Sequence, residues 1–250
     1  MQTTGNTILI TGGGSGIGQA LAIAFQERGN TVIIAGRRQS ALAETVEAHP
    51  GMASVILDIE DRASIAAVAA TLAAEHPDLN VVIHSAGIMR PENILAGELG
   101  DAEAMVATNL LGPIRLTAAL LPQLLKQAKA AILTVSSGLA FVPLAATPTY
   151  SATKAAIHSY SQSLRHQLGG TGIAVHEVVP PYVQTELMGP AQASDPNALP
   201  LADFIAETMQ LLEDQPDARE ILVERVKPLR RAEIDGHFDH VFGMLNAGAH

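Results

Sequence analysis

The chain has no cysteine and no tryptophan, and only five phenylalanines and three tyrosines among its 250 residues. Without cysteine it can form neither disulfides nor thiolate metal sites, and it cannot use a thiol nucleophile. So few aromatic side chains argue against a base-stacking nucleic-acid surface and against an aromatic belt at a membrane interface. The lack of cysteine is compatible with either redox compartment.

Positive charge is also scarce, with 15 Lys and Arg against 25 Asp and Glu, a net charge of −10. This balance argues against a polyanion such as nucleic acid as the main partner. Met1–Asn6 contains no basic residue ahead of the first apolar run, and no uninterrupted apolar stretch approaches the roughly 18 to 20 residues that span a bilayer. We therefore expect a soluble, cytoplasmic protein without a signal peptide or membrane partner.

Short β-branched runs alternate with longer runs rich in alanine and leucine, which predicts an α/β fold with a parallel sheet covered by helices on both faces. The expected strands are Thr7–Thr11, Thr31–Ala35, Ala53–Leu57, Val81–His84, Ala130–Val135, Ile173–Val179 and Glu220–Val226. The expected helices are Ile17–Gly29, Ser40–Ala48, Arg62–Glu75, Ala102–Gln127 (with an interruption at Pro113), Tyr150–Leu168 and Leu201–Leu212. No linker or repeat divides the chain, so one domain over residues 1–250 is predicted.

A glycine-rich turn, TGGGSGIG at residues 11–18, joins the first strand to the first helix. We expect Gly12 to permit a tight turn, Gly16 to let the backbone approach a pyrophosphate, and Gly18 to allow close helix packing. A mononucleotide P-loop would need lysine at Gln19, and a hydrolase nucleophile elbow around Ser15 would need glycine at Ile17. The pattern therefore favours dinucleotide binding.

The end of the second strand indicates which dinucleotide binds. It reads Ala35-Gly36-Arg37-Arg38, and no acidic residue occurs from position 30 to position 43. A free ribose 2′-hydroxyl is usually held by Asp or Glu there, whereas a 2′-phosphate needs cations. NADP(H) is therefore predicted, with NAD(H) less favoured. Asp58, after the third strand, is either a contact to adenine or an ordinary strand-end carboxylate.

Tyr150 and Lys154 lie four residues apart at the start of a predicted helix, so both project from one face. A phenol with a pKa near 10 is a poor acid–base catalyst at neutral pH, and a nearby ammonium lowers that pKa. Ser137 follows the fifth strand, at the sheet edge where open α/β folds bind ligands. Each feature alone is common in purely structural settings; together they predict an active site.

Taken together, these motifs resemble the short-chain dehydrogenase/reductase family along the whole chain. The matching residues are TGGGSGIG at 11–18, Asp58, Ala86-Gly87, Asn109 in NLLG, Ser137, and YSATK at 150–154. The resemblance implies a single-domain Rossmann-type sheet of about seven strands and an NADP(H)-dependent carbonyl reductase or alcohol dehydrogenase. It also implies a homodimer or homotetramer.

The resemblance assigns a role to each site residue. Tyr150 would exchange a proton with the substrate oxygen, Ser137 would hydrogen-bond that oxygen, and Lys154 would bind the nicotinamide ribose and lower the tyrosine pKa. Asn109 would order a water that relays protons to Lys154. The implied dinucleotide contacts are Gly12, Ser15, Gly16, Ile17, Gly18, Arg37, Arg38, Asp58, Ile59, Ala86, Gly87, Tyr150, Lys154, Pro180, Val183 and Thr185. No metal site is expected.

The sequence departs from the family pattern at two places. His84-Ser85 stands where Asn-Asn is usual, and an imidazole could replace the amide as a donor. Pro181 occupies a glycine position, although Thr185 is retained to contact the carboxamide. Residues 186–212 are predicted to form a substrate lid, and their Leu, Met, Ala and Pro content suggests an apolar substrate.

Two alternative functions remain open. A non-catalytic NADP(H)-binding redox sensor would be expected to lack a member of the tetrad, and an NAD-linked dehydrogenase of the same family would differ only in cofactor. An isomerase or dehydratase with the same Tyr/Lys chemistry usually has a longer chain and a different glycine spacing.

Overall fold

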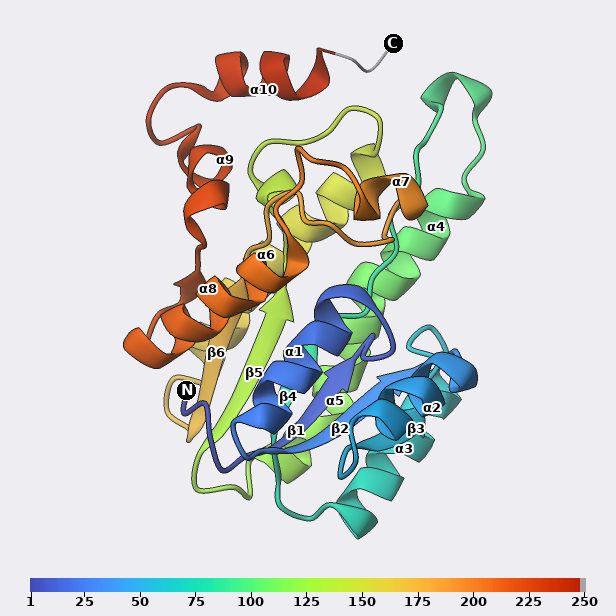
Figure 1. Ribbon diagram of the computed structural model, residues 1–250, viewed down its shortest axis with the longest axis vertical. Coiled ribbons are helices and arrows are strands. Elements are labelled where there is room, and N and C mark those ends of the chain that lie inside the picture. The colour runs from blue at the N-terminus through green and yellow to red at the C-terminus, as the bar shows by residue number, and fades with distance from the viewer. Residues whose placement is uncertain (248–250) are drawn as a thin grey trace.

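Seven apolar segments form one parallel sheet in the order β3-β2-β1-β4-β5-β6-β7 in the computed structural model, which describes residues 1–247 (Figure 1). The sequence predicted this doubly wound α/β architecture, and it is confirmed. The strands are β1 Thr7–Thr11, β2 Thr31–Gly36, β3 Ala53–Ile56, β4 Leu79–His84, β5 Ala130–Val135, β6 Ile173–Val178 and β7 Glu220–Ile221.

Helices cover both faces of the sheet, which explains why most strands are continuously apolar rather than alternating. One face packs against α1, α2 and α8, and the other packs against α3, α5 and α6. The helices are α1 Gly16–Glu27, α2 Gln39–Ala48, α3 Arg62–Glu75, α4 Gly100–Val106, α5 Gly112–Leu124, α6 Pro148–Gln167, α7 Pro190–Ala193, α8 Leu201–Asp214, α9 Lys227–Arg231 and α10 Phe238–Asn246.

The position of β1 determines where a ligand can bind. β1 pairs with β2 on one side and with β4 on the other, so the chain leaves β1 in one direction and later returns to its opposite side. The carboxyl ends of all these parallel strands lie at one edge of the sheet. Open α/β sheets bind ligands in the crevice at such a reversal of strand order.

Three sequence predictions need correction. β7 has only two residues, because only Glu220 and Ile221 pair with β6, and Glu224–Val226 turns into a 3-10 helix. The long helix is interrupted at the π-helical turn Ala107–Leu111, before Pro113, and Pro113 instead occupies the first turn of α5. Helices α7, α9 and α10 were not predicted: α7 and α9 have only four and five residues, and the nine-residue α10 was missed although its apolar residues follow a helical period.

Taken together, Gly100–Leu124 is long and apolar enough to cross a membrane by length and composition alone. Its apolar residues have another explanation here. Leu116, Leu120 and Leu124 are buried in the core beside α3. A core helix passes the same length and composition test.

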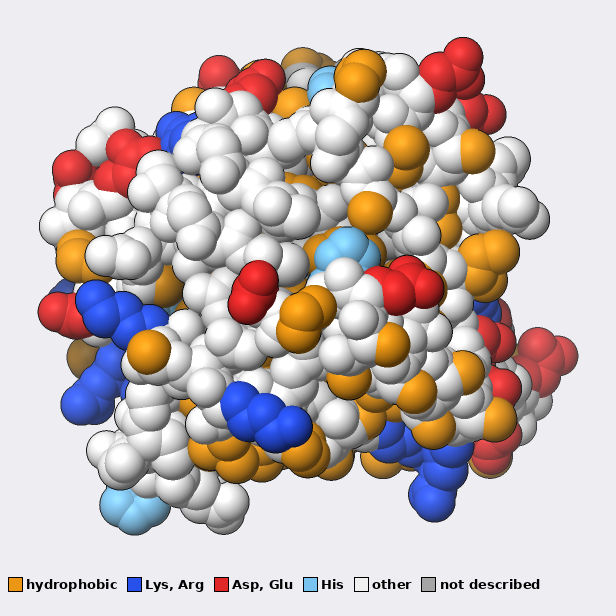
Figure 2. Space-filling model, turned by 90° about the horizontal axis from the view of Figure 1, so that it is seen from below, with side chains coloured by type: hydrophobic (Ala, Val, Ile, Leu, Met, Phe, Trp, Pro, Cys, Tyr) orange, Lys and Arg blue, Asp and Glu red, His pale blue; other side chains and the backbone are white. Residues whose placement is uncertain are grey.

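Figure 2 shows the opposite end of the molecule from the glycine turn, where acidic and basic side chains are interspersed.

Leu120 and Leu95 give a matched test of this packing. Leu120 is 1 % exposed in the core and Leu95 is 98 % exposed. We expect Leu120→Ala to lower the free energy of unfolding by about 3 kcal/mol, because the substitution leaves a cavity that the core only partly fills. Leu95→Ala should change it by less than about 0.5 kcal/mol. Urea denaturation of both variants measures the difference, and equal losses would contradict the assignment of α5 to the core.

Candidate active site

The glycine turn between β1 and α1 can form only because side chains are missing from it. Gly12 and Gly16 both have positive φ angles, at 70° and 55°. A Cβ at Gly18 would lie 2.4 Å from the carbonyl oxygen of Gly12, so α1 can approach the turn only with glycine at this position. The first turn of α1 therefore directs its free backbone N–H groups into the crevice, as an anion site requires.

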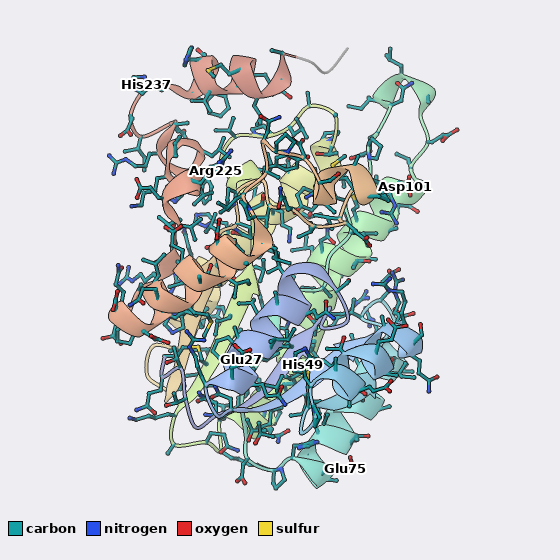
Figure 3. All side chains as sticks on the ribbon, viewed as in Figure 1. Glu27, His49, Glu75, Asp101, Arg225 and His237 are labelled. Atoms are coloured by element: carbon teal, nitrogen blue, oxygen red, sulfur yellow. The ribbon has the colours of Figure 1, made fainter. Side chains whose placement is uncertain are left out.

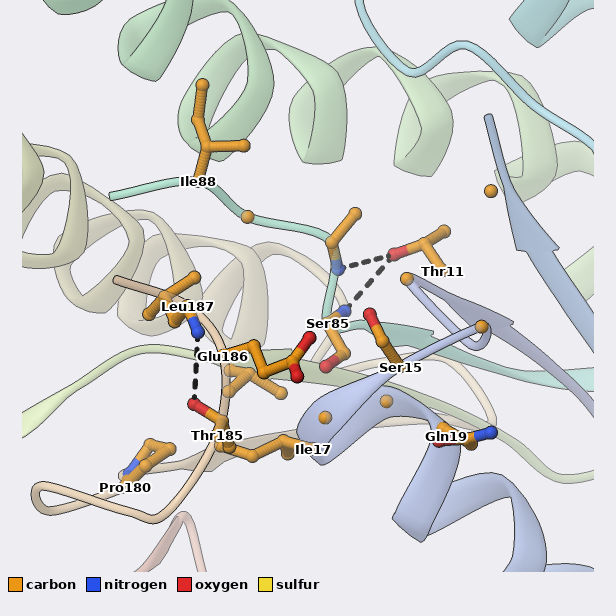
Figure 4. Close-up of a pocket in the computed structure, with 18 of the residues that line it drawn as sticks. Thr11, Ser15, Ile17, Gln19, Ser85, Ile88, Pro180, Thr185, Glu186 and Leu187 are labelled. Carbon is orange, nitrogen blue, oxygen red and sulfur yellow. Dashed lines mark hydrogen bonds between the residues drawn. The ribbon is translucent and has the colours of Figure 1, made fainter. Parts of the chain in front are cut away.

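Thr11 fixes the loop after β4 against β1. Its Oγ1 accepts hydrogen bonds from the backbone N–H groups of Ser85 and Ala86, each at 3.1 Å (Figure 4). Gly12 also contacts this loop closely, because a Cβ there would lie 2.9 Å from Ala86 Cα. The two strand ends thus form one continuous floor beneath the crevice.

A cavity of about 780 Å³ extends along this edge of the sheet, within the size range of ligand and cofactor sites. It brings together every predicted site residue except Asp58 and Asn109. The predicted residues that line it are Gly12, Ser15, Gly16, Ile17, Gly18, Arg37, Arg38, Ile59, Ala86, Gly87, Ser137, Tyr150, Lys154, Pro180, Val183 and Thr185. Segments more than 170 residues apart in the sequence therefore share one cavity.

Tyr150 and Lys154 lie one turn apart near the start of α6, and both are buried. The Lys154 Nζ donates a hydrogen bond of 2.8 Å to the carbonyl oxygen of Val135 and lies 5.4 Å from the centre of the Tyr150 ring. Ser137 lies two residues after the end of β5, and its Oγ accepts a hydrogen bond from Leu139 N–H. A phenol, an ammonium and a hydroxyl thus converge at the inner end of the cavity.

Burial has opposite effects on the two titratable groups of this trio. Burial raises the pKa of Tyr150 well above its usual value, and the hydroxyl of Ser137 offsets only part of the rise. Burial lowers the pKa of Lys154 to about 8, and the charge of Glu177 opposes this change. The sequence predicted that the ammonium would lower the tyrosine pKa; in this structure burial has the larger effect. Tyr150 is therefore a neutral phenol that can donate its proton.

Asn109 lies in the π-helical turn behind the cavity and does not line it. Its Nδ2 donates to Ile88 O at 2.8 Å and its Oδ1 accepts from Ile88 N–H at 2.8 Å. Nδ2 also lies 3.3 Å from Thr153 Oγ1. A π-helical turn often marks a functional site, because the inserted residue redirects a side chain. Here it aims the amide at the loop after β4.

The basic end of β2 has partners that the sequence did not reveal. Arg37 pairs with Glu60 at 3.0 Å, and Arg38 donates to Ser15 Oγ at 2.9 Å. Glu60 follows β3 and also accepts a hydrogen bond of 2.7 Å from Thr108 Oγ1. Asp58 does not line the cavity and accepts a hydrogen bond from Glu60 N–H. No local pattern predicted the Arg37–Glu60 pair, because the two residues meet only through the pairing of β2 with β3.

The segment after β6 closes the cavity on the side opposite the β4 loop. Thr185 lies against the glycine turn, within 3.8 Å of where a Gly16 Cβ would be, and its Oγ1 accepts from Leu187 N–H and Gln192 Nε2. Figure 4 shows the carboxylate of Glu186 pointing from this segment toward Ser15 and Ser85. Glu186 and Arg90 both line the cavity. Sequence reasoning missed both, because single charged loop residues carry no spacing signal.

With this geometry established, comparison with known proteins identifies the family. A family model described as short chain dehydrogenase matches residues 6–196. The chain belongs to the short-chain dehydrogenase family. The family resemblance seen in the sequence is therefore confirmed, and the protein is an oxidoreductase of this family.

The similar proteins span nearly the full chain. The chain is 40 % identical over 251 residues to the uncharacterized oxidoreductase DltE of Bacillus subtilis strain 168, with 98 % of each chain covered. It is similar to a short-chain dehydrogenase from Burkholderia cenocepacia solved with NADP, with a TM-score of 0.82, 25 % identity, and 96 % and 98 % coverage. A Sphingobium yanoikuyae short-chain dehydrogenase solved with NADPH gives a TM-score of 0.79, 26 % identity and 95 % coverage of both chains.

His84, where members of this family commonly have asparagine, bridges the central sheet to α5. Its Nε2 lies 2.9 Å from Thr117 Oγ1, and the side chain is buried. The other ring nitrogen, Nδ1, has no hydrogen-bond partner within residues 1–247. Burial lowers the pKa of His84 to about 4, so the imidazole is neutral at physiological pH.

The histidines of this dehydrogenase do not assemble a metal site among the described residues. Within residues 1–247, no three His, Asp or Glu side chains are placed to hold a metal ion. Figure 3 shows how widely the surface histidines are separated: His49 follows α2, whereas His237 precedes α10 near the other end of the molecule. His84 differs from these histidines because it is buried and its pKa is lowered to about 4.

The lowered pKa of His84 predicts a pH-dependent stability. An unfolded imidazole takes up a proton near pH 6.5, whereas folded His84 stays neutral down to about pH 4. His84 therefore favours folding fully above pH 6.5 and loses that contribution as pH falls through this window, by about 3 kcal/mol in total. We expect His84→Asn to remove this part of the slope. Urea denaturation at several pH values from 7 to 4 compares the two proteins, and parallel curves would contradict the assignment.

Proposed function

We propose that the chain is an NADP(H)-dependent oxidoreductase that moves hydride between nicotinamide and the carbon of a carbonyl or secondary alcohol. One observation carries the proposal. Buried Tyr150 and Lys154 converge with Ser137 at one end of the same cavity whose other end is the glycine turn. This arrangement offers a proton donor and an anion site in one crevice.

The side chains of this chain can carry out the proton chemistry of carbonyl reduction. Tyr150, as a neutral phenol, donates its proton to the substrate oxygen as negative charge develops there. Ser137 donates a hydrogen bond to the same oxygen and orients the carbonyl. Lys154 places an ammonium beside the phenol and stabilises the phenolate that is left behind. A nicotinamide dinucleotide, when bound, supplies or accepts the hydride.

The residues at the outer end of the cavity fit a phosphorylated dinucleotide. Positive φ at Gly12 and Gly16 exposes backbone N–H groups at the start of α1, which suits a pyrophosphate. Arg37 and Arg38 both line the cavity at the end of β2. The exposed pair of Arg37 with Glu60 is weak enough for a ribose phosphate to compete for the guanidinium. The two solved relatives bound to NADP and NADPH support the same choice.

The substrate side of the cavity combines apolar and charged groups. Ile88, Leu187 and Leu201 line it together with Arg90 and Glu186. The apolar residues support the sequence prediction of an apolar substrate that enters beneath residues 186–212. The apolar character of the substrate, the homodimer or homotetramer and the cytoplasmic location stay predictions.

Tyr150→Phe tests the proton donor. We expect it to lower kcat by about 10²- to 10⁴-fold, because the phenyl ring has no proton to give. NADPH affinity, followed by the fluorescence of the bound nucleotide, should stay within about twofold. Tyr160→Phe is a matched control on the same helix, outside the cavity, and should retain activity. A Tyr150→Phe variant as active as the wild type would rule out this role. A wild-type protein that binds NADPH but turns over no carbonyl compound or alcohol would instead favour a non-catalytic, nucleotide-sensing function.

Arg37→Asp tests the cofactor preference. A carboxylate at the end of β2 repels a 2′-phosphate and accepts a hydrogen bond from a free 2′-hydroxyl. We expect the ratio of Kd for NADH to Kd for NADPH to fall by about 10²-fold, or roughly 2.7 kcal/mol. Lys126→Asp makes the same change in charge on an exposed turn outside the cavity and should leave the ratio unaltered. An equal effect of both variants would show that only net charge matters.

A further inference from the structure

Strand β6 carries a buried glutamate, Glu177, on a face whose other side chains are apolar. Alternate residues of the strand face α6, and Ile173 and Val175 pack there against Leu164 in the core. Glu177 is the next residue on that face, and its side chain is only 1 % exposed. An isolated carboxylate is strongly disfavoured in such a place, so its neighbours must compensate the charge.

The best-defined neighbour of Glu177 is His158 on α6. His158 Nδ1 lies 2.8 Å from Glu177 Oε2, and Gln162 Nε2 lies 2.7 Å from His158 Nε2. With the amide of Gln162 donating to Nε2, the Nδ1–H of His158 is free to donate to the carboxylate. The ring of Phe141 packs edge-on against the imidazole, with centroids 4.8 Å apart, and fixes its orientation. Oxygen Oε1 of Glu177 accepts no hydrogen bond within residues 1–247.

Tyr150, Lys154, His158 and Gln162 recur every fourth residue and so follow one face of α6 from the cavity toward the surface. Glu177 interacts electrostatically with Lys154, which is one helical turn from His158. In the sheet, Glu177 is paired with Thr134 of β5, the residue before Val135, whose carbonyl oxygen accepts the hydrogen bond from Lys154. The buried carboxylate therefore lies on the strand next to the one that holds the catalytic ammonium. This carboxylate has no part in the proton transfer described above.

Other charged groups around Glu177 come from three elements. Arg165 lies further along α6, and Arg230 lies on α9. The negative charge of Glu177 acts to raise the pKa of both guanidinium groups. Glu220 on β7 is held by Arg230 through two hydrogen bonds, and Arg219 lies beside it in the chain. Glu220 acts on Arg165 and Arg230, whereas the acid that acts on Lys154 is Glu177. The two carboxylates therefore share Arg165 and Arg230 and differ in their effect on Lys154.

We propose that Glu177, held in place by His158, is the buried counter-ion that keeps the Lys154 ammonium charged inside the active site. Glu177 is thus a positioning residue that acts through Lys154 and touches neither substrate nor cofactor. The inference rests on the proposed function only in that Lys154 works there as a cation.

The sign of the effect follows from the surroundings of Lys154. Burial lowers its pKa to about 8, and the carboxylate of Glu177 opposes that decrease. Replacing the carboxylate by a neutral amide removes the opposing effect, so the pKa of Lys154 should fall further. The ammonium would then be lost at a lower pH, and the alkaline limb of the activity profile should move in the same direction.

Lys154 can be titrated directly, because the chain has only four lysines. Lys126 and Lys129 are exposed and Lys227 is 45 % exposed at its side chain, so Lys154 alone is buried. We would label the full-length protein with ¹³C-lysine, assign the Lys154 signal by its loss in Lys154→Met, and follow it by NMR from pH 6 to 11. This measurement needs neither cofactor nor turnover.

Glu177→Gln should lower the measured pKa of Lys154 by about one unit relative to the wild type. Glu177→Asp keeps the charge and should give a smaller shift. Glu220→Gln makes the same chemical change at the surface end of the cluster and should leave Lys154 within about 0.2 units of the wild type, because Glu177 and not Glu220 acts on the pKa of Lys154 and the effect of a charge falls with distance. An unchanged Lys154 titration in folded Glu177→Gln, or an equal shift in Glu220→Gln, would overturn the proposal.

A second variant covers the case in which Glu177→Gln does not fold. His158→Leu removes the hydrogen bond at Oε2, which makes the carboxylate a weaker counter-ion. It should therefore shift the Lys154 titration the same way by a smaller amount, and no shift would overturn the proposal. A Lys154 titration that moves as expected in a protein without NADPH-dependent carbonyl turnover would instead refute the proposed function alone.

Discussion

Parallel pairing of β1 with both β2 and β4 is the constraint on which the other features of the structure depend. It gathers the carboxyl ends of the strands at one edge and leaves a crevice where the strand order reverses. Helices cover both faces of the sheet. Residues that contact a ligand must therefore come from the segments that follow the carboxyl ends of the strands. The glycine turn, the loop after β4, Ser137 and the segment from Pro180 all do so.

The crevice works only if two steric conditions are met around β1. Gly18 has no side chain, so α1 can approach the turn and direct its amino end at the cavity. Thr11 holds the loop after β4 through two hydrogen bonds to its backbone. Asn109 then holds the next residues of that loop from behind, through both its amide oxygen and its amide nitrogen. The position of the cavity floor is therefore set by hydrogen bonds between distant segments.

Burial also determines the electrostatics of the inner end. It favours the neutral forms of both Tyr150 and Lys154, which keeps a proton on the phenol but weakens the ammonium beside it. A site that needs a neutral acid next to a cation therefore benefits from a buried negative charge that acts on the lysine. Glu177 is buried on β6 outside the cavity lining, and its charge favours the ammonium form of Lys154.

Local patterns were sufficient for most of the fold. The apolar runs that form β1 and β5, and the helix α3, have the boundaries that the sequence predicted, because the two strands are continuous apolar runs and α3 begins directly after its N-cap Asp61. The prediction failed where distant contacts decide the local conformation. β7 ends after two residues because its pairing with β6 ends there, and the π-helical turn at Ala107–Leu111 has no composition signal.

The sequence by itself determined the fold class, the family motifs and which side chains could perform acid–base chemistry, since each depends on residue types at short, regular spacings. Only the tertiary structure decided which charges face one another. Arg37 meets Glu60, and the charge of Glu177 acts on Lys154, because strand pairing and helix packing bring together residues 23 positions apart in each case. Burial, likewise a property of the folded chain, then decides the pKa of the phenol and of the lysine at the centre of the site.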